Sequence, residues 1–150
     1  LAKALGNGLP IGAMLSTEKV GSAFKTGAHA STFGGTPLIT AAALEALRTI
    51  EKENILDKCN AASTYFRSKL EGLKDRHSVV EDVRGIGLLL GMKLKVEGAP
   101  IVNKCIEKGF LINCVQGNTL RFIPPLVISN EEIDLLVECL DEILAGLDML

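Results

Sequence analysis

The middle of the chain carries the pattern of a long amphipathic helix. Between Ile55 and Leu73, apolar side chains recur at steps of three or four residues, which places them on one helical face. Asn54 precedes the pattern and His77 follows it, so we expect a helix over residues 54–76. A face of this kind must be buried against another layer, and the next segment offers a sheet. The face consists of Ile55, Cys59, Ala62, Phe66, Leu70 and Leu73.

The rest of the chain alternates short apolar runs with helical patterns. Two runs flank Gly85-Ile86-Gly87 and two flank Gln116-Gly117-Asn118, and both tripeptides are typical of tight turns. Ser129 and Glu132 have the spacing of a capping box, which predicts the start of a final helix. With the helix over 54–76, these elements predict a small α/β domain over residues 54–150. The predicted strands cover 79–84, 88–95, 110–115 and 119–123, and a further helix covers 100–108.

Residues 1–53 differ from the rest of the chain, because their elements cannot close a core alone. We therefore expect them to belong to a larger domain. The chain also begins at Leu1 without a methionine, and we expect it to be a fragment. The predicted elements are a Gly-rich loop over 1–10, a strand over 11–15, a helix over 18–24, a polar loop over 25–36 and a helix over 37–53, which Thr36 can cap.

Composition excludes several classes of function. A net charge of −2 without any basic run argues against nucleic acid as a partner. No apolar stretch approaches the ~20 residues of a membrane-spanning helix, so we expect no membrane role. Four scattered cysteines and two histidines lack the spacing of zinc ligands, and we expect no metal site. No secretory segment is apparent, which favours reduced thiols in a soluble cytoplasmic protein.

Lys3 is the first candidate for chemistry. It lies in LAKALGNGLP, an apolar segment whose glycines make the backbone permissive. A buried lysine loses its charge readily, which suits an amine that forms an imine with a carbonyl group. An exposed loop lysine is the plain alternative.

Two further segments stand out. Residues 29–36 bring hydroxyl groups and glycines directly before a helix, where they can hold a phosphate, although an ordinary helix cap fits equally well. Arg121 lies in an otherwise apolar strand and needs a partner. A substrate carboxylate would bind it through two parallel hydrogen bonds, and an intramolecular Asp or Glu would satisfy it equally.

Four segments, in this order, resemble those of the class III (fold type I) aminotransferases, which use pyridoxal 5'-phosphate. LAKALGNGLPIGA resembles the segment around their cofactor lysine and HASTFGGTPL their phosphate-binding loop, while VRGIGLLLGMKL and NTLRFIPPLVIS resemble their C-terminal domain. The resemblance implies that Lys3 forms the Schiff base and that Thr32 contacts the cofactor phosphate across a dimer interface. It also implies that Ser31 lies beside the substrate and that Arg121 binds the substrate carboxylate. Residues 1–53 would then be the remnant of the large cofactor-binding domain and the start of the interdomain helix.

Within the family, the segments look most like those of enzymes that exchange an amino group between N-acetylornithine and 2-oxoglutarate, giving glutamate, in arginine biosynthesis. This resemblance implies a cytoplasmic homodimer. Ornithine, succinylornithine or 4-aminobutyrate remains open as the amino donor, because Arg121 would recognise a carboxylate that these substrates share.

The segments also depart from the family pattern. Thr36 stands where related sequences commonly have Asn, and a threonine can still cap the helix. The family's aspartate facing the pyridine nitrogen, its stacking aromatic residue and its other phosphate-binding loop would all precede Lys3. We therefore expect the isolated chain to be inactive, and a non-catalytic α/β domain is the alternative.

Overall fold

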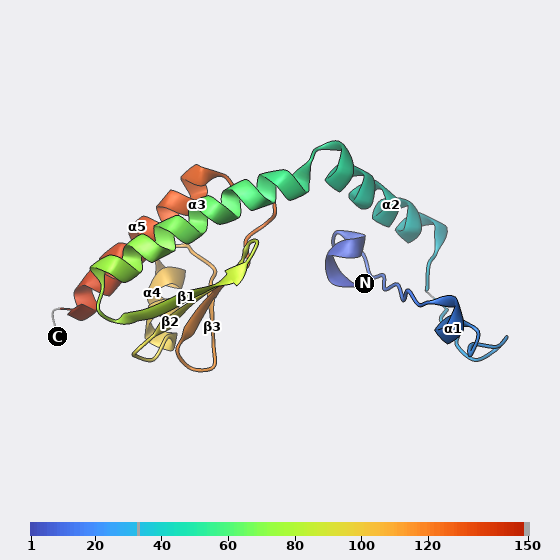
Figure 1. The fold of residues 1–150 in the computed structure, drawn as a ribbon, viewed down its shortest axis with the longest axis horizontal. Helices are drawn as coiled ribbons and strands as arrows, with labels where there is room; N and C mark the ends of the chain where they lie inside the picture. The colour runs from blue at the N-terminus through green and yellow to red at the C-terminus, as the bar shows by residue number, and fades with distance from the viewer. Residues whose placement is uncertain (33, 149–150) are drawn as a thin grey trace. The chain divides into compact units, whose positions relative to one another are not determined.

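The computed structural model describes residues 1–32 and 34–148. The chain forms two compact units, Leu1–Ile55 and Leu56–Leu150, which we describe separately as unit 1 and unit 2 (Figure 1). Phe33, inside the predicted phosphate-binding loop, lies outside the described residues. No helix in the described part of the chain is long and apolar enough to cross a membrane.

Unit 2 is built on a four-stranded antiparallel sheet with the strand order β1-β2-β4-β3. All four predicted strands are present, but the one expected over 110–115 is shorter, because only its last three residues pair with β4. Alternate residues along β2 point to opposite faces, and its Leu90, Met92 and Leu94 are buried. The strands are β1 (Val80–Ile86), β2 (Leu89–Leu94), β3 (Asn113–Val115) and β4 (Thr119–Phe122).

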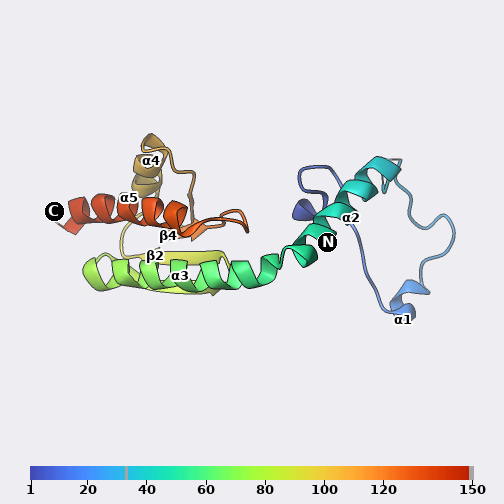
Figure 2. The ribbon, with the colours of Figure 1, turned by 90° about the horizontal axis from the view of Figure 1, so that it is seen from above.

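Helices cover one face of this sheet. The helix α3 (Ile55–Arg76) and the helix α5 (Asn130–Asp148) lie side by side over it (Figures 1 and 2). The helix α4 (Ala99–Glu107) packs against α5 and β3. Phe66 of α3 is fully buried, and its ring meets that of Phe122 edge to face, with the centroids 5.3 Å apart. The apolar stripe predicted for α3 is therefore confirmed as part of the core.

Two acidic residues of α5 join it to α3. Asp134 accepts a hydrogen bond from the Tyr65 hydroxyl (2.8 Å) and forms an ion pair with Lys69 (2.7 Å). The bond from Lys69, and then that from Tyr65, holds the pKa of Asp134 below its usual value. Asp141 forms an ion pair with Arg76 at the end of α3 (3.0 Å) and lies 2.5 Å from Nε2 of His77, the next residue. The bond with His77, more than its other contacts, lowers the pKa of Asp141. These contacts fix the helix pair at its polar edge.

Unit 1 contains the 3-10 helix η1 (Lys3–Gly6) and two α-helices, α1 (Glu18–Gly21) and α2 (Pro37–Lys52). The helix α1 ends three residues earlier than predicted. The predicted strand over 11–15 is wrong, because this segment is irregular. Leu1 and Ala13 exchange two backbone hydrogen bonds, but a strand needs a continuous partner and the described residues of unit 1 supply none.

The helix caps were predicted with mixed success. The capping box of α5 is confirmed: the Glu132 amide donates to Ser129 Oγ (3.2 Å) and the Ser129 amide donates to Glu132 Oε2 (2.8 Å). Thr36 occupies the N-cap position of α2, but its hydroxyl makes no cap bond. Its carbonyl instead accepts bonds from the amide and the hydroxyl of Thr40 (2.9 and 3.0 Å).

Candidate functional site

Lys3 begins η1 with a left-handed backbone, at a φ of 53°. A residue with a Cβ rarely adopts this conformation, so its surroundings must hold it there. The side chain is exposed and borders a hollow of about 410 Å³. The lining of this hollow contains apolar and amide groups and no carboxylate. The other lining residues are Ala4, Asn7, Gly8, Leu9, Pro10 and Ile11.

The loop before α2 exposes both candidate hydroxyl residues, Ser31 and Thr32. Gly34 allows this loop to turn tightly, because a Cβ at Gly34 would come within 3.0 Å of Ser31 Cβ. Gly35 follows in the left-handed region at a φ of +74°. Neither hydroxyl residue lines the hollow beside Lys3. The loop thus holds two hydroxyl groups ahead of a long helix.

Arg121 lies on β4, in one row of the ladder with residues of the three other strands. It pairs with Gly91 of β2 and with Asn113 of β3, and Gly91 in turn pairs with Arg84 of β1. Arg121 Nε donates a hydrogen bond to Asn113 Oδ1 (3.1 Å). No Asp or Glu in the described part of the chain forms an ion pair with Arg121, so the intramolecular carboxylate left open by the sequence is not found.

The turn between β1 and β2 is formed by Gly87 and Leu88, later than the predicted Gly85-Ile86-Gly87, because β1 continues through Ile86. A Cβ at Gly85 would collide with the backbone of Leu89 and Leu90, so only glycine fits the position. The turn is also tied to α3, because the Arg67 guanidinium donates to the Gly85 carbonyl (2.5 Å) and a serine of α3 donates to the Gly87 carbonyl (2.7 Å). Gly85 therefore lets the end of β1 approach β2 closely, and Gly87 lies in the anchored turn between the two strands.

A second hollow, of about 360 Å³, lies on the sheet face around Gly91. Arg84 and Arg121 both line it. Arg84 was not predicted as a site residue, because its place beside Arg121 follows from the register of the strands and not from the sequence spacing. The remaining lining residues are Gly85, Leu89, Leu90, Gly91, Val115, Gln116 and Thr119.

The predicted site residues fall into two groups. Lys3, Ser31 and Thr32 belong to unit 1, and Arg121 belongs to unit 2. Within residues 1–32 and 34–148, no group of three or more His, Cys, Asp and Glu side chains could hold a metal ion. Any chemistry assembled from these residues therefore relies on an amine, hydroxyl groups and guanidinium groups.

The four cysteines are free thiols. Two of them are buried, and burial is the main reason why the pKa of Cys105 rises to about 12. Burial is likewise the main cause of the raised pKa of Cys139. Neither buried cysteine is suited to act as a nucleophile, and both pack in the core of unit 2.

The chain matches the class-III aminotransferase family over residues 1–144. The acetylornithine aminotransferase of Methanocaldococcus jannaschii is 47% identical over 143 residues, which cover 95% of this chain and 36% of that protein. That of Caldanaerobacter subterraneus subsp. tengcongensis is 47% identical over 146 residues, covering 97% and 37%. The chain thus spans little more than a third of the length of these relatives.

Solved structures show the same relationship. The ornithine delta-aminotransferase of Plasmodium falciparum has a TM-score of 0.87 at 30% identity, covering 98% of this chain and 38% of that one. The acetylornithine aminotransferase of Elizabethkingia anophelis has a TM-score of 0.78 at 31% identity, covering 88% and 34%. The mixture of helices with a small antiparallel sheet is thus that of fold type I aminotransferase chains, as predicted. The chain belongs to the class-III aminotransferase family.

Proposed function

We propose that the chain is part of a pyridoxal-phosphate-dependent aminotransferase that transfers the δ-amino group of N-acetylornithine to 2-oxoglutarate, a step in arginine biosynthesis. The family match carries this proposal, together with relatives named acetylornithine aminotransferase at 40 to 47% identity. Because the chain spans 33 to 38% of those relatives, the activity is proposed for a protein of their length that contains it, called the full-length protein below.

Lys3 is the residue we propose to hold the cofactor. Its amine is exposed beside a hollow without carboxylates, so an aldehyde can reach it and no acidic partner competes. When bound, pyridoxal phosphate supplies the electron sink that stabilises a carbanion beside the amino group. The Lys3 amine would first act as a base and remove a proton from the substrate carbon that bears the amino group. It would then act as an acid and donate the proton to a different atom.

The loop before α2 fits the phosphate of such a cofactor. The first N–H groups of a helix lack partners inside it, and the helix dipole favours an anion at this end. The hydroxyls of Ser31 and Thr32 are exposed shortly before this end of α2. Thr32 would bind the phosphate of the partner's cofactor in a homodimer, and Ser31 would lie beside the substrate. Sedimentation of the full-length protein tests the dimer, and fractionation of cells tests its cytoplasmic location.

Arg121 is proposed to bind the substrate carboxylate. Among the described residues, its side chain donates one hydrogen bond, from Nε to a neutral amide, so the charge of the guanidinium is not neutralised by that contact. A carboxylate can bind such a group through two parallel hydrogen bonds, which fixes both its position and its orientation.

Two measurements on the full-length protein test this function. Lys3→Ala should abolish transamination, and retained full activity would show that another group does the chemistry. Rates with N-acetylornithine, ornithine, succinylornithine and 4-aminobutyrate should be highest for the first donor. Ornithine is the main alternative, because solved ornithine aminotransferases share the fold. The 150-residue chain alone should show no turnover, and steady turnover would contradict our assignment of essential cofactor contacts to the rest of the protein.

A further inference from the structure

The face of the sheet that carries Arg121 also carries a second arginine. Arg84 and Arg121 point to the same face, because both pair with Gly91 in the antiparallel ladder. Neighbouring strands are about 4.8 Å apart, so the two backbones are about 10 Å apart across β2. Gly91 places no side chain between them. A ligand lying over Gly91 can therefore reach both guanidinium groups.

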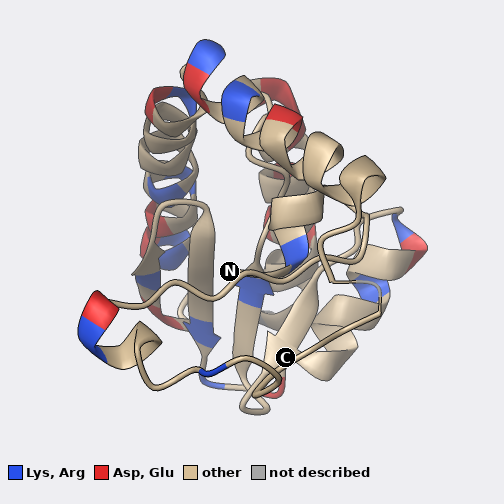
Figure 3. Cartoon of the chain, turned by 90° about the vertical axis from the view of Figure 1, so that its right-hand side faces the viewer, with Lys and Arg blue, Asp and Glu red and all other residues tan. Residues whose placement is uncertain are grey.

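Neither arginine is neutralised by a carboxylate. The Arg121 side chain donates to Asn113, and the Arg84 side chain has no hydrogen bond or ion pair to any described residue. No Asp or Glu lines the hollow that they share. Figure 3 shows blue segments on the strands of the sheet, while the red segments lie mainly on helices. Other basic side chains of unit 2 do pair with carboxylates: Lys69, Lys74, Arg76, Lys93 and Lys108.

Thr119 adds an unused hydrogen-bonding group to the same hollow. It lies two residues before Arg121 on β4, so its side chain is on the same face. The residue is only 4% exposed, and its hydroxyl has no hydrogen-bond partner among the described residues. A buried hydroxyl without a partner is unfavourable. The methyl group of Thr119 faces Gly91, so a change of rotamer would bring the hydroxyl to an anion bound there.

We propose that Arg84 is a second carboxylate-binding residue beside Arg121, and that the pair favours a substrate with two carboxylates over one with a single carboxylate. The inference rests on the proposed function, in which 2-oxoglutarate carries two carboxylates. N-acetylornithine carries one carboxylate and one ammonium group, so a second guanidinium contributes less to its binding. Arg84 thus sets the preference for the amino acceptor.

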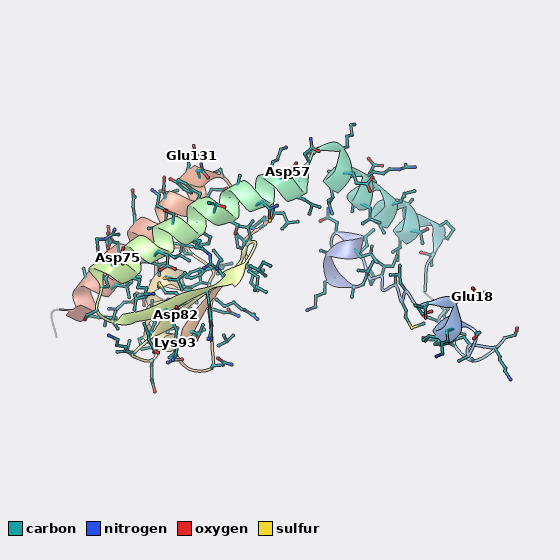
Figure 4. All side chains as sticks on the ribbon, in the orientation of Figure 1. Glu18, Asp57, Asp75, Asp82, Lys93 and Glu131 are labelled. Carbon is teal, nitrogen blue, oxygen red and sulfur yellow. The ribbon has the colours of Figure 1, made fainter. Side chains whose placement is uncertain are left out.

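Kinetics of the full-length protein test this role. Arg84→Gln should raise KM for 2-oxoglutarate by roughly two- to fivefold, the range for a charged contact at an exposed site. It should leave kcat and KM for N-acetylornithine nearly unchanged. Arg84→Lys should recover part of the loss, because it keeps the charge but not the planar fork. Lys93→Gln is the matched control, since it removes one charge from the same face but Lys93 is already paired with Glu81 (2.7 Å; Lys93 is labelled in Figure 4).

A binding measurement separates this inference from the proposed function. We would titrate the 150-residue chain with glutarate and, separately, with butyrate, and follow the Nε–H signals of its arginines by NMR. Glutarate should shift the signals of Arg84 and Arg121 more than butyrate does. Thr119→Val should reduce the shifts that glutarate causes. Selective binding of glutarate to the chain, combined with no transaminase activity in the full-length protein, would support Arg84 and refute the proposed function. An unchanged KM for 2-oxoglutarate in full-length Arg84→Gln, or equal shifts of the two arginine signals with both acids, would overturn the role of Arg84.

Discussion

Replacing Phe66 by alanine should remove one of the fully buried contacts that hold α3 on the sheet. Its side chain is fully buried, and its ring packs edge to face on Phe122 at 5.3 Å. Truncation of a buried phenylalanine costs about 3–5 kcal/mol, from lost burial and from the cavity left behind. Of this, the aromatic pair contributes about 0.5–1.5 kcal/mol. Since small domains are stable by only about 5–15 kcal/mol, this is a large share of the total.

Urea unfolding followed by far-UV circular dichroism measures the effect. At a slope of about 2 kcal/mol per molar urea, the midpoint should fall by about 2 M with the slope unchanged. Leu56→Ala is the control on the same helix, because Leu56 is 65% exposed and its truncation should cost little. In a double-mutant cycle, Phe66→Leu and Phe122→Leu should be coupled by about 1 kcal/mol. Equal midpoint shifts for Phe66→Ala and Leu56→Ala would refute the packing of α3 described above.

Three further predictions concern charge, capping and the turn. His77, more than any other group, lowers the pKa of Asp141, so this carboxylate stabilises the fold above its unfolded pKa and the gain is lost as pH falls below about 4. Thermal melts of Asp141→Asn should therefore lose less stability in acid than melts of the unmodified chain. Ser129→Ala removes the hydroxyl of the α5 capping box and should cost about 1 kcal/mol in urea unfolding. Gly85→Ala should cost about 3 kcal/mol or more, because its Cβ meets the backbone of β2 at a φ of +139°. Gly87→Ala, at a φ of +53° with open space around it, should cost only about 1 kcal/mol in the same assay.

Local patterns predicted the elements of unit 2 well. The stripe that contains Phe66 repeats every three or four residues, and a face of this kind has one stable solution, burial against another layer. Ser129 and Glu132 bond to each other over three residues, so the start of α5 depends on nothing distant.

Features that depend on distant partners were not predicted. Residues 11–15 have the composition of a strand, but a strand forms only beside another strand, and none pairs with it in the described part of unit 1. The place of Arg84 beside Arg121 depends on β2 lying between β1 and β4, and sequence spacing does not reveal that order. The importance of Lys3 came from family resemblance, because from local chemistry alone it is an exposed loop lysine.

The central claim is that Lys3 carries the cofactor. The full-length protein would be incubated with pyridoxal phosphate and reduced with borohydride, and its modified lysines would be mapped by peptide mass spectrometry. Lys3→Arg serves as the control, because it keeps a positive charge but removes the reactive amine. We predict one pyridoxyl group, on Lys3, that is absent from the variant. A single group on another lysine, or equal labelling of the unmodified protein and Lys3→Arg, would contradict it.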